Sequence, residues 1–169
     1  MNVHLLASRP IDDVAIDALR EFAPKDEPLT VAYSGGKDSC VILDLVKRSG
    51  LPFETHYSFV PLDPPELRAF IRLQAEDASN RLHTDYPARK FLDVAREKRM
   101  MPHRGKKGGR WCCEVFKHSS SSSTNTTVLG IRWAESPKRQ ARGLFEQRRS
   151  GAGRIINPII GWSHADVWQ

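Results

Sequence analysis

The chain has no long apolar run and little cysteine. These two shortages argue against a membrane-spanning protein and against a disulfide-rich secreted protein. Among its 169 residues no stretch approaches the roughly 20 consecutive apolar residues that a membrane-spanning helix needs. Residues 1–10 lack the layout of a secretory signal peptide. Only three cysteines are present, and Cys112 and Cys113 are adjacent, where a mutual disulfide is strained. We therefore expect a cytoplasmic protein with reduced thiols and no membrane partner.

The remaining composition is that of an ordinary globular domain. Hydrophobic residues make up 40% of the chain and charged residues 27%, which is enough of each for a packed core and a solvated surface. A chain of this length fits one domain with a sizeable core. We therefore expect a single domain over residues 1–169.

The net charge of +6 is unevenly distributed along the chain. Residues 1–88 carry 9 Lys and Arg against 14 Asp and Glu, which is a net charge of −5. Residues 89–118 carry 10 against 3, a net charge of +7, and residues 132–154 carry 7 against 2, a net charge of +5. Such basic segments line an anionic-substrate pocket, face nucleic acid, or form a solvated surface, and the sequence leaves all three open.

The most informative motif is a run of six residues, Ser34-Gly35-Gly36-Lys37-Asp38-Ser39. Residues 29–33 before it are apolar and β-prone, and residues 40–47 after it are apolar at helical spacing. Two glycines allow a tight turn whose N–H groups converge, and the following helix adds its own free N–H groups and dipole. The motif predicts a phosphate-binding loop, and a simple glycine turn with a helix cap is the alternative.

The spacing of the motif narrows the type of loop. It lacks the four residues that separate the first glycine from the Gly-Lys pair in a Walker A loop. It also differs from the Gly-x-Gly-x-x-Gly turn of dinucleotide-binding domains. Lys37 supplies a mobile cation, and Ser34 and Ser39 supply hydroxyl donors. We therefore expect the loop to hold the pyrophosphate end of a nucleotide.

Strands alternate with helices along the chain, and this alternation predicts the fold. Strands are expected over residues 29–33, 53–59, 82–84, 127–131 and 154–160, and helices over 11–22, 40–47, 89–100, 111–118 and the stretch that begins at 63. The pattern is typical of an α/β fold, a parallel sheet with helices on both faces. Ligands of such sheets bind at the carboxyl ends of the strands, where the six-residue loop and Arg132 are expected to meet.

A basic segment after the fourth expected strand extends the predicted anion site. Arg132 follows that strand, where its guanidinium is suited to bidentate binding of phosphate or sulfate. Ser136 and Arg139 offer further donors, and Gly130 lies at the same strand end. We expect all four to join the loop as phosphate-binding residues, with Lys37 and Arg132 as the catalytic pair. A solvated surface turn is the alternative.

The adjacent thiols of Cys112 and Cys113 are a candidate partial metal site. Soft thiolates suit iron–sulfur clusters, but such clusters normally take four cysteine ligands. The third cysteine, Cys40, lies on the helix after the phosphate loop and is expected to be a core residue. The alternative is a structural pair, with one thiol buried and one partly exposed.

Together these segments resemble the phosphoadenosine phosphosulfate (PAPS) reductase family of the PP-loop superfamily, the N-type ATP pyrophosphatases. The resemblance covers most of the chain, from about residue 29 onward, and implies an adenine nucleotide alpha hydrolase-like fold. It is greatest to the small members, often carried by phages or mobile elements, that keep an intact loop. The matching pieces occur in the family's order at residues 34–39, 63–66, 110–114, 130–136 and 157–162.

The resemblance implies binding of ATP with Mg²⁺ and cleavage between the α and β phosphates, with adenylylation of a substrate in sulfur or nucleic-acid modification. Gly35, Gly36, Lys37 and Ser39 would then hold the pyrophosphate, and Asp38 would position Mg²⁺ or cap the helix. One alternative is a sulfonucleotide reductase that uses a thioredoxin-like reductant. Another is a DNA phosphorothioation or tRNA thiolation subunit bound to nucleic acid, and a third is a fragment that binds nucleotide without turnover.

Two departures from the family pattern concern the cysteines. Members with paired cysteines usually carry a Cys-x-x-Cys further downstream, which completes an iron–sulfur site, and this sequence stops at Gln169 without one. The late catalytic cysteine segment of the family's reductases is also absent. We therefore expect a chain truncated at its C-terminus, with a cluster only where downstream cysteines exist.

Overall fold

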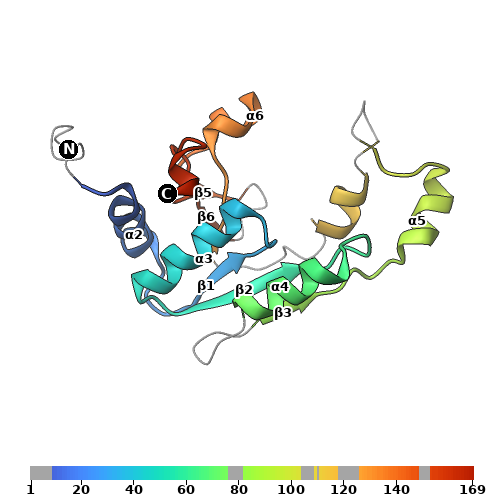
Figure 1. Cartoon of the computed structure of the whole chain (residues 1–169), viewed down its shortest axis with the longest axis horizontal. Coiled ribbons are helices and arrows are strands. Elements are labelled where there is room, and N and C mark those ends of the chain that lie inside the picture. The colour runs from blue at the N-terminus through green and yellow to red at the C-terminus, as the bar shows by residue number, and fades with distance from the viewer. Residues whose placement is uncertain (1–8, 76–81, 104–108, 110, 118–125, 149–152) are drawn as a thin grey trace.

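The fold is built on a mostly parallel sheet, as Figure 1 shows. The computed structural model describes residues 9–75, 82–103, 109, 111–117, 126–148 and 153–169. Within these residues the sheet has six strands in the order β3-β2-β1-β4-β6-β5. The strands are β1 (Leu29–Ala32), β2 (Phe53–Ser58), β3 (Leu82–Asp85), β4 (Thr127–Val128), β5 (Phe145–Gln147) and β6 (Arg154–Ile156). The expected α/β class is confirmed.

The strand order changes direction at β1, and this change places the site. From β1 the chain builds outward through β2 to β3, and it then returns to pair β4 with the other side of β1. Loops that leave β1 and β4 therefore diverge at their carboxyl ends and open a crevice, the usual ligand position in such sheets. Both segments that we expect to bind phosphate follow these two strands.

Three helices lie near β1 to β3 in Figure 1: α2 (Ile11–Phe22), α3 (Lys37–Ser49) and α4 (Pro65–Ala75). α3 begins at Lys37, earlier than its apolar spacing indicates, and α2 packs against it. Gly50 ends α3 in the left-handed conformation, with φ of 72°, as a C-capping glycine does. The helix expected over residues 11–22 is confirmed, because α2 has the same first and last residues.

The main hydrophobic cluster lies between the helices and the sheet. Its fully buried members come from α2, α3, α4 and the central strands, and include Leu19, Val31, Ile42, Ile71, Val128 and Ile156. Helical spacing alone placed Phe70 on the inner face of α4, but this side chain is 40% exposed. That expectation was wrong because Leu67 and Ile71 already occupy the inner face, against the phosphate loop.

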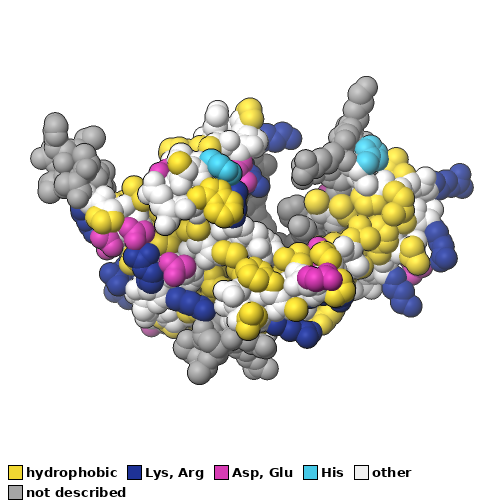
Figure 2. Space-filling model, in the orientation of Figure 1, with side chains coloured by type: hydrophobic (Ala, Val, Ile, Leu, Met, Phe, Trp, Pro, Cys, Tyr) yellow, Lys and Arg dark blue, Asp and Glu magenta, His cyan; other side chains and the backbone are white. Residues whose placement is uncertain are grey.

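A second, smaller cluster lies beside the β3 edge in Figure 1. It joins α5 (Phe91–Lys98) to a helical segment that starts at Trp111 and continues as the π-helix η1 (Cys113–Lys117). Its buried side chains are Val60, Phe91, Val94, Trp111 and Phe116. Figure 2 shows hydrophobic side chains gathered on this part of the surface, and Leu92 of α5 is 61% exposed.

The last third of the chain departs most from expectation. It contains the short helices η2 (Trp133–Glu135) and α6 (Pro137–Gln140), and then β5, an antiparallel strand in a stretch expected to be loop. β5 escaped prediction because only its middle residue turns inward, so it has no apolar alternation. The strand expected over residues 127–131 ends at Val128, and the final helix is one turn, η3 (Asp166–Trp168).

Ser163 and Asp166 cap that last turn, as their spacing of three residues in the sequence indicates. The Ser163 backbone N–H donates to Asp166 Oδ2 at 2.7 Å, and the Asp166 N–H donates to Ser163 Oγ at 3.2 Å. The sequence also has a low-complexity Ser/Thr/Asn stretch over residues 119–127, of which all but the last two lie outside the described residues. Across the described part of the chain, every helix is too short or too polar to span a bilayer.

Candidate functional site

The loop between β1 and α3 requires glycine at one position for two reasons. Gly35 has φ of 70°, in the left-handed region that costs other residues about 1–2 kcal/mol. A Cβ at Gly35 would also lie 2.8 Å from Leu67 Cδ1 and 3.0 Å from Ile71 Cγ1. The loop is therefore pressed against α4.

Two hydroxyl groups brace this loop from inside. Ser39 Oγ donates to the Gly36 carbonyl at 2.7 Å and accepts the Ser34 backbone N–H at 3.3 Å. The two serine hydroxyls are 3.4 Å apart, and Ser39 is buried. Because a hydroxyl has one proton, Ser39 must turn away from Gly36 before it can donate to a phosphate.

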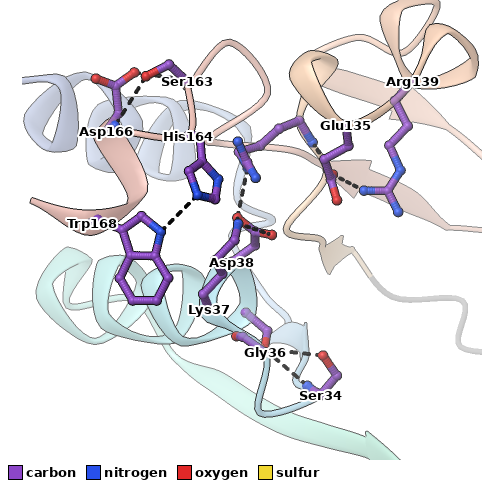
Figure 3. Close-up of polar contacts among 12 residues, drawn as sticks. Ser34, Gly36, Lys37, Asp38, Glu135, Arg139, Ser163, His164, Asp166 and Trp168 are labelled. Carbon is purple, nitrogen blue, oxygen red and sulfur yellow. Dashed lines mark hydrogen bonds and ion pairs between the residues drawn. The ribbon is translucent and has the colours of Figure 1, made fainter.

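The carboxylate of Asp38 links two cations at the start of α3. Lys37 Nζ donates to Asp38 Oδ1 at 2.8 Å and to Oδ2 at 3.0 Å. Arg132 Nε donates to Asp38 Oδ1 at 2.8 Å, and the Arg132 side chain is almost entirely buried. Figure 3 shows Lys37 and Asp38 together at the first turn of the helix. Arg132 therefore orients Asp38, and removal of Asp38 would leave the buried Arg132 guanidinium without this carboxylate partner.

The opposite wall is formed by η2 and α6. The Arg132 backbone N–H donates to Glu135 Oε2 at 3.0 Å, and the same oxygen forms an ion pair with Arg139. Figure 3 shows Glu135 and Arg139 facing one another. At Gly130 a Cβ would lie 3.1 Å from the Asp38 carbonyl group, so this glycine permits close approach of the two walls.

Between the walls lies a cavity of about 210 Å³, lined by Ala32, Ser34, Gly36, Asp38, Ser39, Gly130, Glu135 and Arg139. Its volume corresponds to roughly seven water molecules, which leaves room for a phosphate or sulfate group. Three cations (Lys37, Arg132 and Arg139) against two carboxylates (Asp38 and Glu135) leave a net charge of +1. The site is therefore suited to an anion, but every one of its cations already has a carboxylate partner.

Most of the predicted site residues meet here. Residues 34–39, Gly130, Arg132 and Arg139 all come together, whereas Ser136 is the N-cap residue of α6 and does not line the cavity. The sequence reasoning missed Ala32 and Glu135, which do line it. A signal for Glu135 was available, because an acidic residue three positions after the N-cap residue of a helix, here Arg132, is typical of a capping box.

The cysteines lie elsewhere. Cys112 packs against the second hydrophobic cluster, where burial, and then the neighbouring Cys113, raise the pKa of its thiol. Cys40 lies on α3, with its Sγ 3.4 Å from the Tyr33 hydroxyl. None of the three lines the phosphate cavity. Two thiols at one place do not supply the four ligands that an iron–sulfur cluster takes, so the described residues do not fit that cofactor.

Comparison with known proteins agrees with this architecture. Residues 28–169 match the family described as the phosphoadenosine phosphosulfate reductase domain. A similar solved structure is the phosphate complex of phosphoadenylyl-sulfate (PAPS) reductase from Candida auris, with a TM-score of 0.66. The two are 19% identical, and the match covers 98% of this chain and 79% of that one, a likeness that shows the fold. No curated protein matches the chain.

Proposed function

The chain belongs to the phosphoadenosine phosphosulfate reductase domain family, within the PP-loop superfamily, and we propose that it binds ATP and cleaves it between the α and β phosphates. The observation that carries the proposal is the cavity at the start of α3, with Lys37 beside it and Arg139 in its wall. A nucleotide phosphate in that cavity would be close to the first turn of a helix of 13 residues. Backbone N–H groups of such a turn have no partner within the helix, which favours an anion there.

Binding requires Lys37 to change partner. In the structure its ammonium group is held by Asp38, one residue away. A pyrophosphate carries more negative charge than one carboxylate, so the ammonium group would turn into the cavity. Asp38 keeps Arg132 as its partner and is the residue that would hold Mg²⁺, which supplies charge neutralisation between the phosphates when bound.

The reaction that we propose is an adenylyl transfer. An acceptor oxygen attacks the α phosphorus, the P–O bond between the α phosphorus and the bridging oxygen breaks, and pyrophosphate leaves with that oxygen and its electron pair. The acceptor loses its proton to water, and its adenylyl ester is the second product. Lys37 and the N–H groups of α3 stabilise the charge that develops on pyrophosphate. Arg132 contributes as a positioning residue, through Asp38.

A second candidate function is sulfonucleotide reduction, which the family match supports. The cavity would accept a sulfate as readily as a phosphate, because both are tetrahedral oxyanions of similar size. Reduction needs a nucleophilic thiolate beside the bound anion, however, and none of the three cysteines lines the cavity at the start of α3. We therefore favour ATP cleavage, with a thioredoxin-like partner needed only for the second candidate.

Nucleic acid is the polymeric acceptor that we propose to test. Part of the basic segments at residues 89–118 and 132–154 lies outside the described residues. Within the described part, Arg89, Arg139 and Arg142 each pair with a glutamate. Binding through the remaining cations would weaken steeply as salt concentration rises. Salt-insensitive or absent binding in a filter or anisotropy assay would remove this acceptor.

The nucleotide site is tested by calorimetric titration of the full chain with ATP, adenylyl sulfate and PAPS, each with Mg²⁺. We expect ATP to bind, and Lys37→Ala to weaken binding about 10- to 100-fold, since a charged hydrogen bond contributes about 1.5–3 kcal/mol. Lys47→Ala is the matched control, because Lys47 lies at the other end of α3 and contacts the Gln74 carbonyl. Equal affinities of wild type and Lys37→Ala would contradict the loop assignment.

The reaction itself is tested by product analysis. Cleavage at the α phosphorus releases pyrophosphate, whereas ordinary ATPase activity releases orthophosphate. Sulfite release from adenylyl sulfate or PAPS with a dithiol reductant would instead support the reductase. Nucleotide binding without either product would leave a binding domain and would contradict both reactions for this chain.

A further inference from the structure

Four side chains that the nucleotide site does not use share one face of the sheet at its β3 edge. Glu54 and His56 alternate along β2, and His83 and Asp85 alternate along β3. The strands are parallel, with His56 opposite His83 and Ser58 opposite Asp85, so all four side chains project to the same side. The other side of these strands faces α4, where Tyr57 and Thr84 line a small cavity. The four residues therefore form one cluster on the face away from α4.

Three of these side chains converge at metal-ligand distances. Glu54 Oε2 lies 3.8 Å from His56 Nε2 and 3.7 Å from His83 Nε2, and the ligand atoms of all three lie within 4.8 Å of one another. The two imidazole rings stack, with centroids 4.8 Å apart and planes 15° apart. Ligands of tetrahedral Zn²⁺, at bonds of about 2.0–2.1 Å, lie about 3.4 Å apart. The two Glu54 pairs are within about 0.4 Å of that spacing, and the widest of the three separations would have to shorten by up to about 1.4 Å, which side-chain rotation can supply.

His83 Nε2 is a buried atom that has no hydrogen-bond partner. A buried imidazole nitrogen normally has a partner, and at 3.7 Å the Glu54 oxygen is too distant to be one. His56 is oriented from its other side, because its Nδ1 lies 3.4 Å from Asp85 Oδ2. A carboxylate on Nδ1 favours the tautomer that leaves the Nε2 lone pair free for a metal. Both histidines thus present Nε2 toward Glu54.

We propose that Glu54, His56 and His83 bind a divalent transition metal of the Zn²⁺ class, with Asp85 orienting His56. Two imidazoles and one carboxylate are a ligand set that suits such ions, and hard cations such as Mg²⁺ and Ca²⁺ prefer oxygen ligands alone. Three protein ligands leave the fourth tetrahedral position for water or a substrate group.

The proposed metal site is connected to the cavity at the start of α3 through paired strands. Ala32 lines that cavity and is paired with His56, which in turn is paired with His83. The backbone also connects the strands here, since the Tyr33 N–H donates to the His56 carbonyl at 2.8 Å. With strands about 4.8 Å apart, the metal would lie one to two strands from the cavity, roughly 5–10 Å. An acceptor bound beside the nucleotide would be within reach of its open position.

The test is a titration of the full chain with Co²⁺ and Zn²⁺ in a Cys112→Ser, Cys113→Ser background, which removes the adjacent thiols as competing ligands. We expect one equivalent of Co²⁺ to bind with the visible d–d absorption of a four-coordinate ion, and Zn²⁺ to displace it. His83→Ala should lose that absorption and weaken Zn²⁺ binding at least 100-fold. Asp85→Asn should weaken it 10- to 100-fold, as loss of an orienting carboxylate does.

His164→Ala is the matched control, because His164 is an exposed histidine that accepts a hydrogen bond from Trp168 and is not part of the cluster. It should leave metal affinity unchanged. Glu54→Gln provides a second variant at a half-exposed position, in case His83→Ala does not fold. Binding that survives both His83→Ala and Glu54→Gln in folded protein, or absence of stoichiometric binding, would overturn the proposal. ATP affinity in the same variants separates this result from the fate of the nucleotide site.

Discussion

The two hydrophobic clusters of this protein differ in size and in what they support. Among the described residues, the main cluster joins buried side chains from three helices and four strands, most of them aliphatic. The second cluster has five buried members, three of them aromatic, around α5 and η1. The phosphate loop rests on the main cluster, through Leu67 and Ile71 against Gly35, and Cys112 packs on the second. We therefore expect the proposed nucleotide binding to depend on the first cluster, and the ionisation of Cys112 to depend on the second.

The largest expected effect on stability comes from truncating one buried side chain in each cluster. Ile156 in β6 and Phe116 in η1 are both fully buried. Ile156→Ala should lower the free energy of unfolding by about 2–5 kcal/mol and Phe116→Ala by about 3–5 kcal/mol where the whole chain unfolds together. We expect Phe116→Ala to loosen mainly α5 and η1, and to leave ATP affinity within about twofold of wild type.

Urea unfolding followed by circular dichroism, together with ATP titration, measures both effects. Leu92→Ala is a control in the second region, since this side chain is exposed and its loss should change little. Parallel loss of ATP affinity in the Ile156 and Phe116 variants would show that the two clusters act as one cooperative unit. It would contradict the expectation that ATP binding depends on the main cluster alone.

A smaller effect is expected from the contact that joins the loop to the main cluster. Gly35→Ala adds both left-handed strain and a Cβ 2.8 Å from Leu67 Cδ1. Gly50→Ala is a close control, because Gly50 has nearly the same φ, 72°, and no atom within 4 Å of the added Cβ. Gly50→Ala should destabilise the protein by about 1–2 kcal/mol through left-handed strain alone. Gly35→Ala should destabilise it further, because its Cβ also meets Leu67. Only Gly35→Ala should weaken ATP binding, by about tenfold, and calorimetry that found equal ATP affinities would refute the proposed role of this contact.

The smallest effect concerns the thiols of the second cluster. Burial raises the pKa of Cys112, so less thiolate is present at a given pH than in the unfolded chain. Alkylation of Cys112 at pH 8 should therefore be slower in the native protein than in denaturant, and should accelerate as pH rises. Mass spectrometry of the labelled peptide measures the rate, and saturating ATP should not change it. A faster native reaction, or protection by ATP, would place the thiol nearer the nucleotide site than the two-cluster comparison allows.

Much of the site was predictable because its residues act locally. The loop at 34–39 lies between a strand and a helix, and the Gly50 cap and the Ser163–Asp166 pair each involve neighbours within a few positions. The short strand β5 and the exposure of the Phe70 side chain were not predictable from local sequence. Both outcomes depend on which distant residues pack against β5 and α4, and local periodicity carries no information about those residues.

The sequence by itself determined the phosphate-loop motif, the alternation of strands and helices and the family. Turn, cap and periodicity rules operate over a few residues, and they are strong where glycine or proline is required. Only the tertiary structure decided that Arg132 would meet Asp38 across 94 positions, that Glu135 would line the cavity, and that His56 would lie opposite His83. Each of these depends on strand order and register, which arise when separate elements bury a common core and satisfy one another's backbone hydrogen bonds.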